Sequence, residues 1–278
     1  MAITAKMVKE LRDATSVGMM DCKKALVETD GDFDAAVKIL RERGAAVAAK
    51  RADKEANEGI IAANVTDDAQ SAAMIEVNCE TDFVARNEDF QAFVAELSVA
   101  ALNHETDTMA EAIAEQITDK ISSIGEKLQL RRNVKWNVEG TGAIASYIHM
   151  GGKVGVLLEL GCEKAETLGS PVFKELAKDL TLHVAAAAPQ YQTRDEVPAE
   201  LVEAEQEIFR KQLVGKPEKM IDNILIGKTN KFFSQICFVE QGFVKEDKVS
   251  ITDLVAEKGK ELGDTLTIKR YVRYQLGA

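Results

Sequence analysis

Apolar residues near the N-terminus recur at helical spacing in three short segments. The first helix is predicted to begin after Thr4, which can cap it, and the second to run from about 20 to 28. Asp32 can cap the third helix, which we expect to end at Gly44. Three helices this short enclose a small interior, and such units usually bind polypeptides. The apolar face expected for the third helix comprises Phe33, Ala36, Val37 and Leu40.

The pattern changes after an alanine- and charge-rich segment at 45–58, which is read as a helical connector. Two apolar runs at 60–65 and 72–79 flank a polar turn at 67–68, an arrangement typical of a β-hairpin. Further elements are predicted as helices at 89–102 and 109–121 and a strand at 134–138.

The second half of the chain repeats the order of hairpin, short loop and helix. Two such units, related by duplication, predict an α+β fold with a duplicated hairpin-helix core. Aligning the two copies places the following residues opposite one another: Cys79 and Cys162, Phe90 and Phe173, Phe93 and Leu176, Leu97 and Leu180.

The segment after Pro189 departs from the repeat. Two helices at 198–214 and 217–228, joined around 215–217, predict an antiparallel helical hairpin inserted into the second unit. The rest is expected to form a strand at 232–239, a helix at 252–258 and a strand at 265–274. The predicted domains are therefore 1–54, 55–140 and 141–278, the last carrying the helical hairpin at about 198–230.

Charge and composition narrow the classes of function. The 278 residues include 35 basic and 46 acidic side chains, a net charge of −11, which argues against a general nucleic-acid binder. No apolar run is long enough to span a bilayer and the first residues do not resemble a signal peptide, so a cytoplasmic chain without membrane contact is expected. The four cysteines contain no C-x-x-C pair, which favours reduced thiols.

Motifs that resemble catalytic or binding chemistry are weak. The segment 226–229 resembles the end of a phosphate-binding loop, but Asp222 stands where that motif needs glycine, so a lysine-rich helix end is favoured. Lysines near Cys22 could lower its thiol pKa, although a packed helical cysteine is favoured. The three histidines lack metal-ligand spacing. We predict no metal, no cofactor and no catalytic residue, and therefore a protein that is not an enzyme.

The two copies differ in the loop between hairpin and helix. The first copy has Glu80-Thr81-Asp82-Phe83-Val84, and the second places Glu166 opposite Phe83. The scaffold therefore does not require a large aromatic side chain at this position. Two interpretations remain open: Phe83 anchors a partner's pocket, or it packs beneath its own helix.

The sequences VGMMDCKKAL at Val17–Leu26 and EVNCETDFVARN at Glu76–Asn87 closely resemble two signatures of the bacterial elongation factor Ts family. The resemblance implies a guanine-nucleotide exchange factor for elongation factor Tu, with a ubiquitin-associated-like N-terminal domain. In that family the T-D-F-V loop displaces magnesium from the partner's nucleotide site; here it is Thr81, Asp82, Phe83 and Val84. Further matching segments are Ser123–Arg132, Ser146–Leu160, His183–Pro189 and Gly215–Ile221.

The same resemblance implies additional contacts with elongation factor Tu in its GDP-bound and nucleotide-free forms. Longer family members continue into another helical module, so any contact made by that module is in doubt here. An apolar stripe on the helical hairpin leaves a homodimer open. The alternatives are an adaptor that binds protein without exchange activity and, less favoured, an enzyme with an unrecognised cleft. The implied contacts are Val17, Gly18, Met19, Met20 and Lys23 in the N-terminal domain and, more weakly, Ile124, Gly125, Glu126 and His149.

Overall fold

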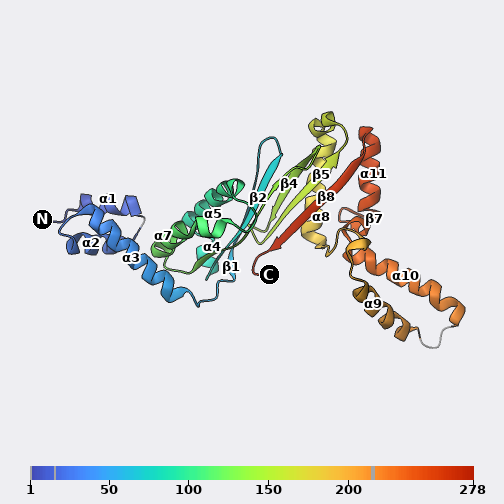
Figure 1. Ribbon diagram of the computed structural model, residues 1–278, viewed down its shortest axis with the longest axis horizontal. Helices are drawn as coiled ribbons and strands as arrows, with labels where there is room; N and C mark the ends of the chain where they lie inside the picture. Colours follow the sequence, from blue (N-terminus) through green and yellow to red (C-terminus); the bar gives the residue numbers. More distant parts are fainter. Residues whose placement is uncertain (1, 16, 214–216) are drawn as a thin grey trace.

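The computed structural model describes residues 2–15, 17–213 and 217–278. It is elongated, with three N-terminal helices at one end, two β-sheets in the middle and a helical hairpin projecting at the other end (Figure 1). Residue 16, in the predicted break after the first helix, lies outside the described residues. So do residues 215 and 216 of the hairpin turn predicted around 215–217, together with residue 214 before it.

The N-terminal helices begin where the sequence predicts caps. Helix α1 (Ala5–Thr15) starts after Thr4, whose hydroxyl accepts a hydrogen bond from the Met7 amide at 3.3 Å. Asp32 caps α3 by accepting from the Ala35 amide at 3.0 Å. Phe33, at the start of the predicted apolar face of this helix, is exposed, whereas Ala36 and Leu40 are buried. Between them lies α2 (Met19–Glu28), and the small core comprises Val8, Leu11, Val17, Cys22, Ala25, Leu26, Ala36 and Leu40.

The third helix does not end at Gly44. Helix α3 runs unbroken over Phe33–Arg51 and carries the chain from the N-terminal helices to the first sheet (Figure 1). Gly44 is buried against α7 (Ala114–Ile124), where a Cβ would lie 2.8 Å from the Cβ of Ser122. This glycine therefore permits close helix packing instead of ending a helix. Arg41 and Glu115 add an ion pair across the same contact at 3.0 Å.

Each half of the core contains a three-stranded antiparallel sheet. The strand orders are β1-β2-β3 and β4-β5-β8, so the duplicated hairpin gains a third strand in both halves. Both sheets shift register at aligned positions, after Glu76 in β2 and after Glu159 in β5. The strands are β1 (Glu58–Val65), β2 (Ser71–Cys79), β3 (Leu128–Asn137), β4 (Gly142–His149), β5 (Val154–Cys162) and β8 (Leu266–Gln275).

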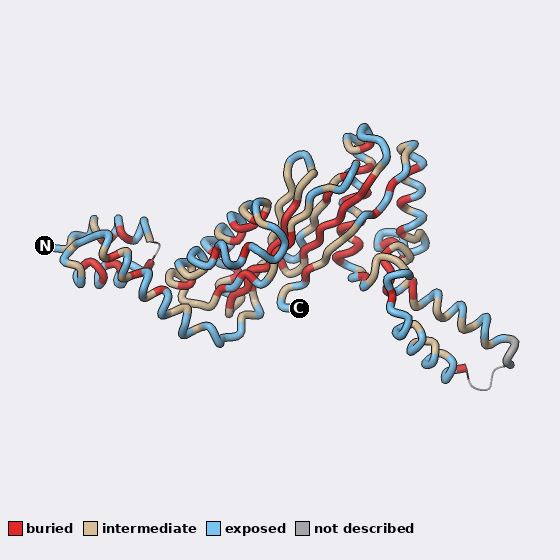
Figure 2. Tube along the Cα trace, viewed as in Figure 1, coloured by how far each residue is buried: buried red, intermediate tan, exposed pale blue. Residues whose placement is uncertain are grey.

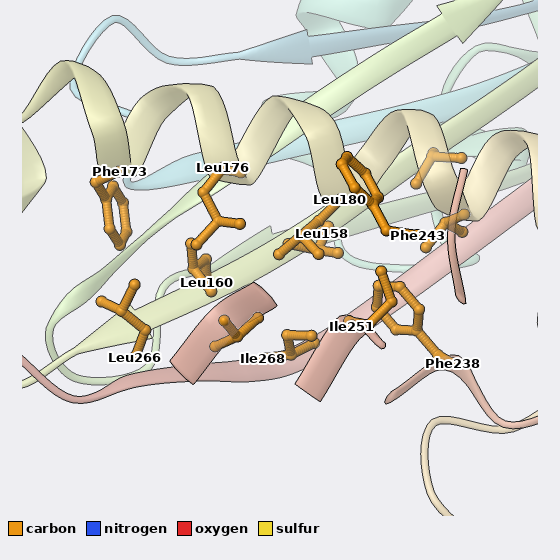
Figure 3. Close-up of a cluster of buried hydrophobic side chains, with 14 of the residues drawn as sticks. Leu158, Leu160, Phe173, Leu176, Leu180, Phe238, Phe243, Ile251, Leu266 and Ile268 are labelled. Carbon is orange, nitrogen blue, oxygen red and sulfur yellow. The ribbon is translucent and has the colours of Figure 1, made fainter. Parts of the chain in front are cut away.

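The two sheets pack face to face, and helices cover their outer faces. Helices α5 (Glu88–Ala100) and α7 cover the first sheet, whereas α8 (Pro171–Ala187) and α11 (Ile251–Leu262) cover the second. Strand β2 is buried on both faces because alternate side chains enter different cores: Ile75 faces the helices and Met74 faces the other sheet. The central strands are accordingly the most buried part of the molecule (Figure 2). Figure 3 shows the outer core of the second half, where α8 side chains point toward β5 and β8.

Reciprocal polar contacts join the two halves. The Ile61 amide donates to the Gly152 carbonyl at 2.8 Å, and the aligned Ile144 amide donates to the Ala69 carbonyl at 2.9 Å. Each half also buries a glutamate that accepts from an arginine of its own third strand, and that arginine stacks on an aromatic ring of the other half. The two sets are Glu76 with Arg132 on Tyr274, and Glu159 with Arg270 on Trp136.

The segment between α8 and α11 is the predicted insertion. Helices α9 (Ala199–Gln212) and α10 (Glu218–Ile236) form its hairpin. Helix α10 extends to Ile236, so the strand predicted at 232–239 is wrong: Phe233 and Ile236 bury their apolar surface from a helix. The segment 226–229 lies inside α10, so its helical interpretation is confirmed and the phosphate-loop resemblance is dismissed. The predicted helix end at Lys228 is wrong, because α10 continues to Ile236.

The remaining elements are short. They are α4 (Asp82–Ala85), α6 (Met109–Ala112), β6 (Gly242–Phe243), β7 (Glu246–Ser250) and the 3₁₀ turns Ala101–Asn103, Ala165–Gly169, Arg194–Glu196 and Phe238–Glu240.

Candidate partner-binding site

The Thr81–Val84 segment presents one aromatic side chain to solvent. Thr81 caps the single-turn helix α4, its hydroxyl accepting from the Val84 amide at 3.3 Å. Ala85 is buried and Val84 packs against the core of the first half, which fixes the turn from below. Phe83 is 81% exposed. The interpretation that Phe83 packs beneath its own helix is therefore wrong.

Glu126 fixes the start of this turn. Its carboxylate accepts from the Thr81 amide at 3.1 Å and from the Thr81 hydroxyl at 2.8 Å. Gly125, at a φ of 81°, ends α7 in the left-handed conformation and turns the chain toward Thr81, while Ile124 packs into the core. Of the three residues named as weaker contacts on this segment, two therefore support the loop and one fills the core.

The residue before the turn is held from the other side. Glu80 pairs with Arg51 through two hydrogen bonds of 2.8 Å and accepts from the Lys127 amide at 2.6 Å. Burial disfavours the charged carboxylate, but these hydrogen bonds outweigh it and hold the pKa of Glu80 below its usual value. The last turn of α3 is thus anchored to the loop that carries Phe83.

The second half has the same support without the aromatic tip. Asp264, aligned with Glu126, accepts from the Lys164 amide at 3.1 Å and from the Thr167 hydroxyl at 2.5 Å. A 3₁₀ turn replaces α4, and Glu166 stands opposite Phe83. The acidic support belongs to the duplicated scaffold, whereas the exposed aromatic residue belongs to the first half.

The turn that follows His149, the last residue of β4, approaches the same end of the first sheet. Lys153 pairs with Glu58 at 2.5 Å, and Glu58 lies opposite Cys79, two residues before Thr81. His149 is exposed, and its Nδ1 lies 3.0 Å from the Tyr147 hydroxyl. The neighbouring Met150 is 72% exposed. A second exposed apolar side chain, which the sequence did not predict as a contact, therefore lies beside the predicted histidine.

The predicted residues of the N-terminal helices separate into core and surface. Val17 is buried, so it supports the three-helix unit. Met19, Met20 and Lys23 are exposed, and Gly18 precedes the first turn of α2. Val27 is 56% exposed and lies seven residues after Met20, on the same helix face. That spacing was available in the sequence and would have identified Val27 as part of this apolar surface.

The cysteines are not activated. Cys22 is fully buried, and burial raises the pKa of its thiol, which confirms the packed interpretation. Burial likewise raises the pKa of Cys79 to about 12. Within the described ranges, no group of three or more histidine, cysteine or acidic side chains could hold a metal ion. No described helix is long and apolar enough to cross a membrane.

The sequence is similar to one family of known proteins. A family model described as Elongation factor TS matches residues 80–278, more than half of the chain. An elongation factor Ts of Clostridium botulinum is 42% identical over 287 residues, covering 99% of this chain and 93% of the relative. That of Syntrophotalea carbinolica is 44% identical over 290 residues, covering 100% and 94%, and that of Nitratidesulfovibrio vulgaris is 41% identical over 279 residues, covering 100% and 96%. The chain belongs to the elongation factor Ts family.

Proposed function

We propose that this protein is a guanine-nucleotide exchange factor for elongation factor Tu in translation elongation. The observation that carries the proposal is the 81% exposure of Phe83 on a turn fixed by Thr81 and Glu126. An exposed aromatic side chain on a rigid support is suited to enter a partner's pocket, because little conformational entropy is lost on binding. Such a residue acts on its partner without bond-making chemistry.

The proposed mechanism acts on the metal ion of the partner. Bound nucleotide is held by phosphate contacts and by magnesium, which neutralises phosphate charge. Insertion of Phe83 displaces the partner elements that arrange the magnesium ligands, and release of the ion leaves the phosphates repelling one another. Asp82, which pairs with Arg86 at 3.0 Å, supplies a carboxylate beside the tip that competes for polar contacts. Nucleotide release is therefore accelerated.

Thermodynamic linkage completes the cycle. If the factor weakens nucleotide binding to elongation factor Tu, nucleotide weakens binding of the factor by the same ratio. The factor accordingly binds both the GDP-bound and the nucleotide-free forms, and entry of GTP expels it. Without this reciprocity the factor would stay bound to nucleotide-free elongation factor Tu.

The other surfaces are proposed as secondary contacts. Met19, Met20 and Lys23 of a ubiquitin-associated-like three-helix domain contact the partner's nucleotide-binding domain. His149 and Met150 contact the partner from the neighbouring turn. The segment 76–126 carries twelve acidic and two basic residues, and this charge steers encounter with a partner of complementary charge.

Self-association through the helical hairpin is a separate proposal. Leu201, Ile208 and Ile226 are exposed on α9 and α10. A homodimer that uses them would lose its dimeric mass in light scattering when the hairpin is deleted. A monomeric mass for the intact chain, or an unchanged dimer after deletion, would dismiss this use of the hairpin.

Release of fluorescent GDP from elongation factor Tu tests the exchange function. The full chain should accelerate release, and added magnesium should oppose the acceleration. Binding to elongation factor Tu with no change in the release rate would favour the adaptor instead. Absence of binding would remove both hypotheses.

A further inference from the structure

The outer face of the second half contains an open groove of about 770 Å³ between α11 and the start of β8. Its lining includes Val255 and Gly259 of α11 and Leu266 of β8, all of which are buried in the core below. Ala256 and Glu163 are exposed at its edge. Neither Phe83 nor any other residue proposed above to contact elongation factor Tu lines the groove.

The internal duplication shows what occupies the equivalent surface in the first half. Helices α7 and α11 correspond, since each ends in a left-handed glycine, Gly125 or Gly263, followed by the acidic residue that supports the loop. In the first half, α3 packs on α7. One face of α3 carries the contacts with the first half, at positions i, i+3, i+4 and i+7. Gly44 meets α7, Val47 and Ala48 pack against the first-half core, and Arg51 bonds Glu80.

The residues that line the groove align with the α7 residues that α3 contacts in the first half. Gly44 approaches Thr118 and Ser122 of α7, and these align with Ala256 and Lys260, both of which line the groove. A small residue facing α7 allows the two helices to approach closely. In the first half, α3 thus covers the surface that corresponds to the open groove of the second half.

The charge at the edge of the groove also matches. Glu80 binds Arg51 of α3 through two hydrogen bonds of 2.8 Å, and Glu163 aligns with Glu80. Among the described residues, no basic side chain pairs with Glu163, which is exposed. Glu163 therefore offers an unpaired carboxylate where the first half binds an arginine.

We propose that this groove docks an amphipathic helix of another protein, bearing a small residue at position i, apolar residues at i+3 and i+4, and an arginine or lysine at i+7. The basic residue pairs with Glu163, and the apolar stripe covers Val255, Gly259 and Leu266. The α3 helix of a second copy is a poor occupant, because its Arg51 is already paired with Glu80 and Lys127 donates to the carbonyls at the end of the helix.

A peptide spanning residues 39–54 serves as the probe, because it carries the stripe in the order the groove requires. A lactam between Glu42 and a lysine introduced by Ala46→Lys holds it helical on its exposed side. Binding to the full, isotope-labelled chain is followed by NMR. Signals of α11 and the start of β8 should shift saturably. Ala256→Trp, which fills the groove from an exposed position, should abolish the shifts.

Reversing the charges of Glu163 and of Arg51 in the peptide tests the proposed ion pair. Glu163→Arg should weaken the peptide about tenfold, and Arg51→Glu in the peptide should restore binding to that variant. Glu166→Arg, in the same loop but outside the groove, should leave affinity unchanged. Shifts confined to α7, an affinity indifferent to both groove variants, or no binding would overturn the proposal. Self-association of the chain that Ala256→Trp abolishes would assign the groove to a second copy and overturn it as well.

Discussion

The carboxylate of Glu126 holds Thr81 at two atoms, the amide nitrogen at 3.1 Å and the hydroxyl oxygen at 2.8 Å. Because Thr81 caps the turn that carries Phe83, we expect Glu126→Ala to let the turn fray and to slow nucleotide exchange several-fold. Loss of hydrogen bonds to a charged group should also cost about 1–3 kcal/mol of stability. Amide hydrogen exchange at Val84 and the rate of GDP release measure the two effects.

The duplication offers the control for this prediction. Asp264→Ala removes the corresponding support from the second half and should destabilise the chain comparably without slowing exchange. Equal losses of exchange activity in the two variants would contradict a specific role for Glu126.

The buried glutamates make their arginines indispensable to stability. Glu76 is fully buried, and Arg132 donates to it at 2.8 Å. Arg132→Ala leaves that charge without its partner and should cost about 3–5 kcal/mol in urea unfolding. By the same reasoning Arg270→Ala should cost a similar amount. Arg86→Ala, which breaks an exposed pair with Asp82, should change stability by less than about 1 kcal/mol.

Gly44 should be less tolerant of alanine than its place inside a helix suggests. Alanine normally stabilises a helix interior by about 1 kcal/mol relative to glycine. Here the added methyl group would lie 2.8 Å from the Cβ of Ser122, so Gly44→Ala should lower the melting temperature. The double variant Gly44→Ala with Ser122→Gly should recover it. A single variant more stable than wild type would show that α3 does not pack closely on α7.

His183 should make stability fall in mild acid. Its Nδ1 accepts from the Val244 amide at 3.2 Å, so its Nε2 carries the proton directed at Gln241. Burial lowers the pKa of His183 below its ordinary value of 6.5, although the Gln241 hydrogen bond opposes the shift. The unfolded chain therefore binds the proton more tightly. The stabilisation is fully present above pH 6.5 and is lost as pH falls from there through the folded pKa.

Urea unfolding between pH 7.5 and pH 5 measures this loss. The free energy of unfolding should fall less steeply with decreasing pH in His183→Gln than in wild type. The same slope in wild type and His183→Gln would contradict the linkage.

The sequence pattern predicts the fold well where local signals decide the structure. Asp32, with a polar side chain before an apolar periodic run, correctly marks the start of a helix. Gly44 misleads because glycine can either end a helix or permit close packing. Here its role is decided by Ser122, which packs against it from a helix distant in sequence. Phe233 misleads because the largely apolar segment 232–239 fits either a strand or a buried helix.

The candidate site is predictable to a different degree. Comparison of the two copies identifies Phe83 as unnecessary for packing, but its exposure is decided by Val84 and Ala85 filling the space beneath the turn. The hydrogen bonds of Glu126 to Thr81 join residues 45 positions apart, and no local pattern encodes that distance. Met150 escapes notice because a methionine in a hairpin turn carries no periodic signal.

The most direct test of the proposed mechanism is stopped-flow release of fluorescent GDP from elongation factor Tu by Phe83→Ala. Val99→Ala, which truncates another exposed apolar residue of the first half, is the matched control. Phe83→Ala should slow factor-stimulated release about 10- to 100-fold, as expected for the loss of an aromatic side chain that becomes buried in the partner. Its melting temperature should equal that of wild type. The control should exchange normally. Wild-type release rates with Phe83→Ala would contradict the central claim that this side chain drives nucleotide exchange.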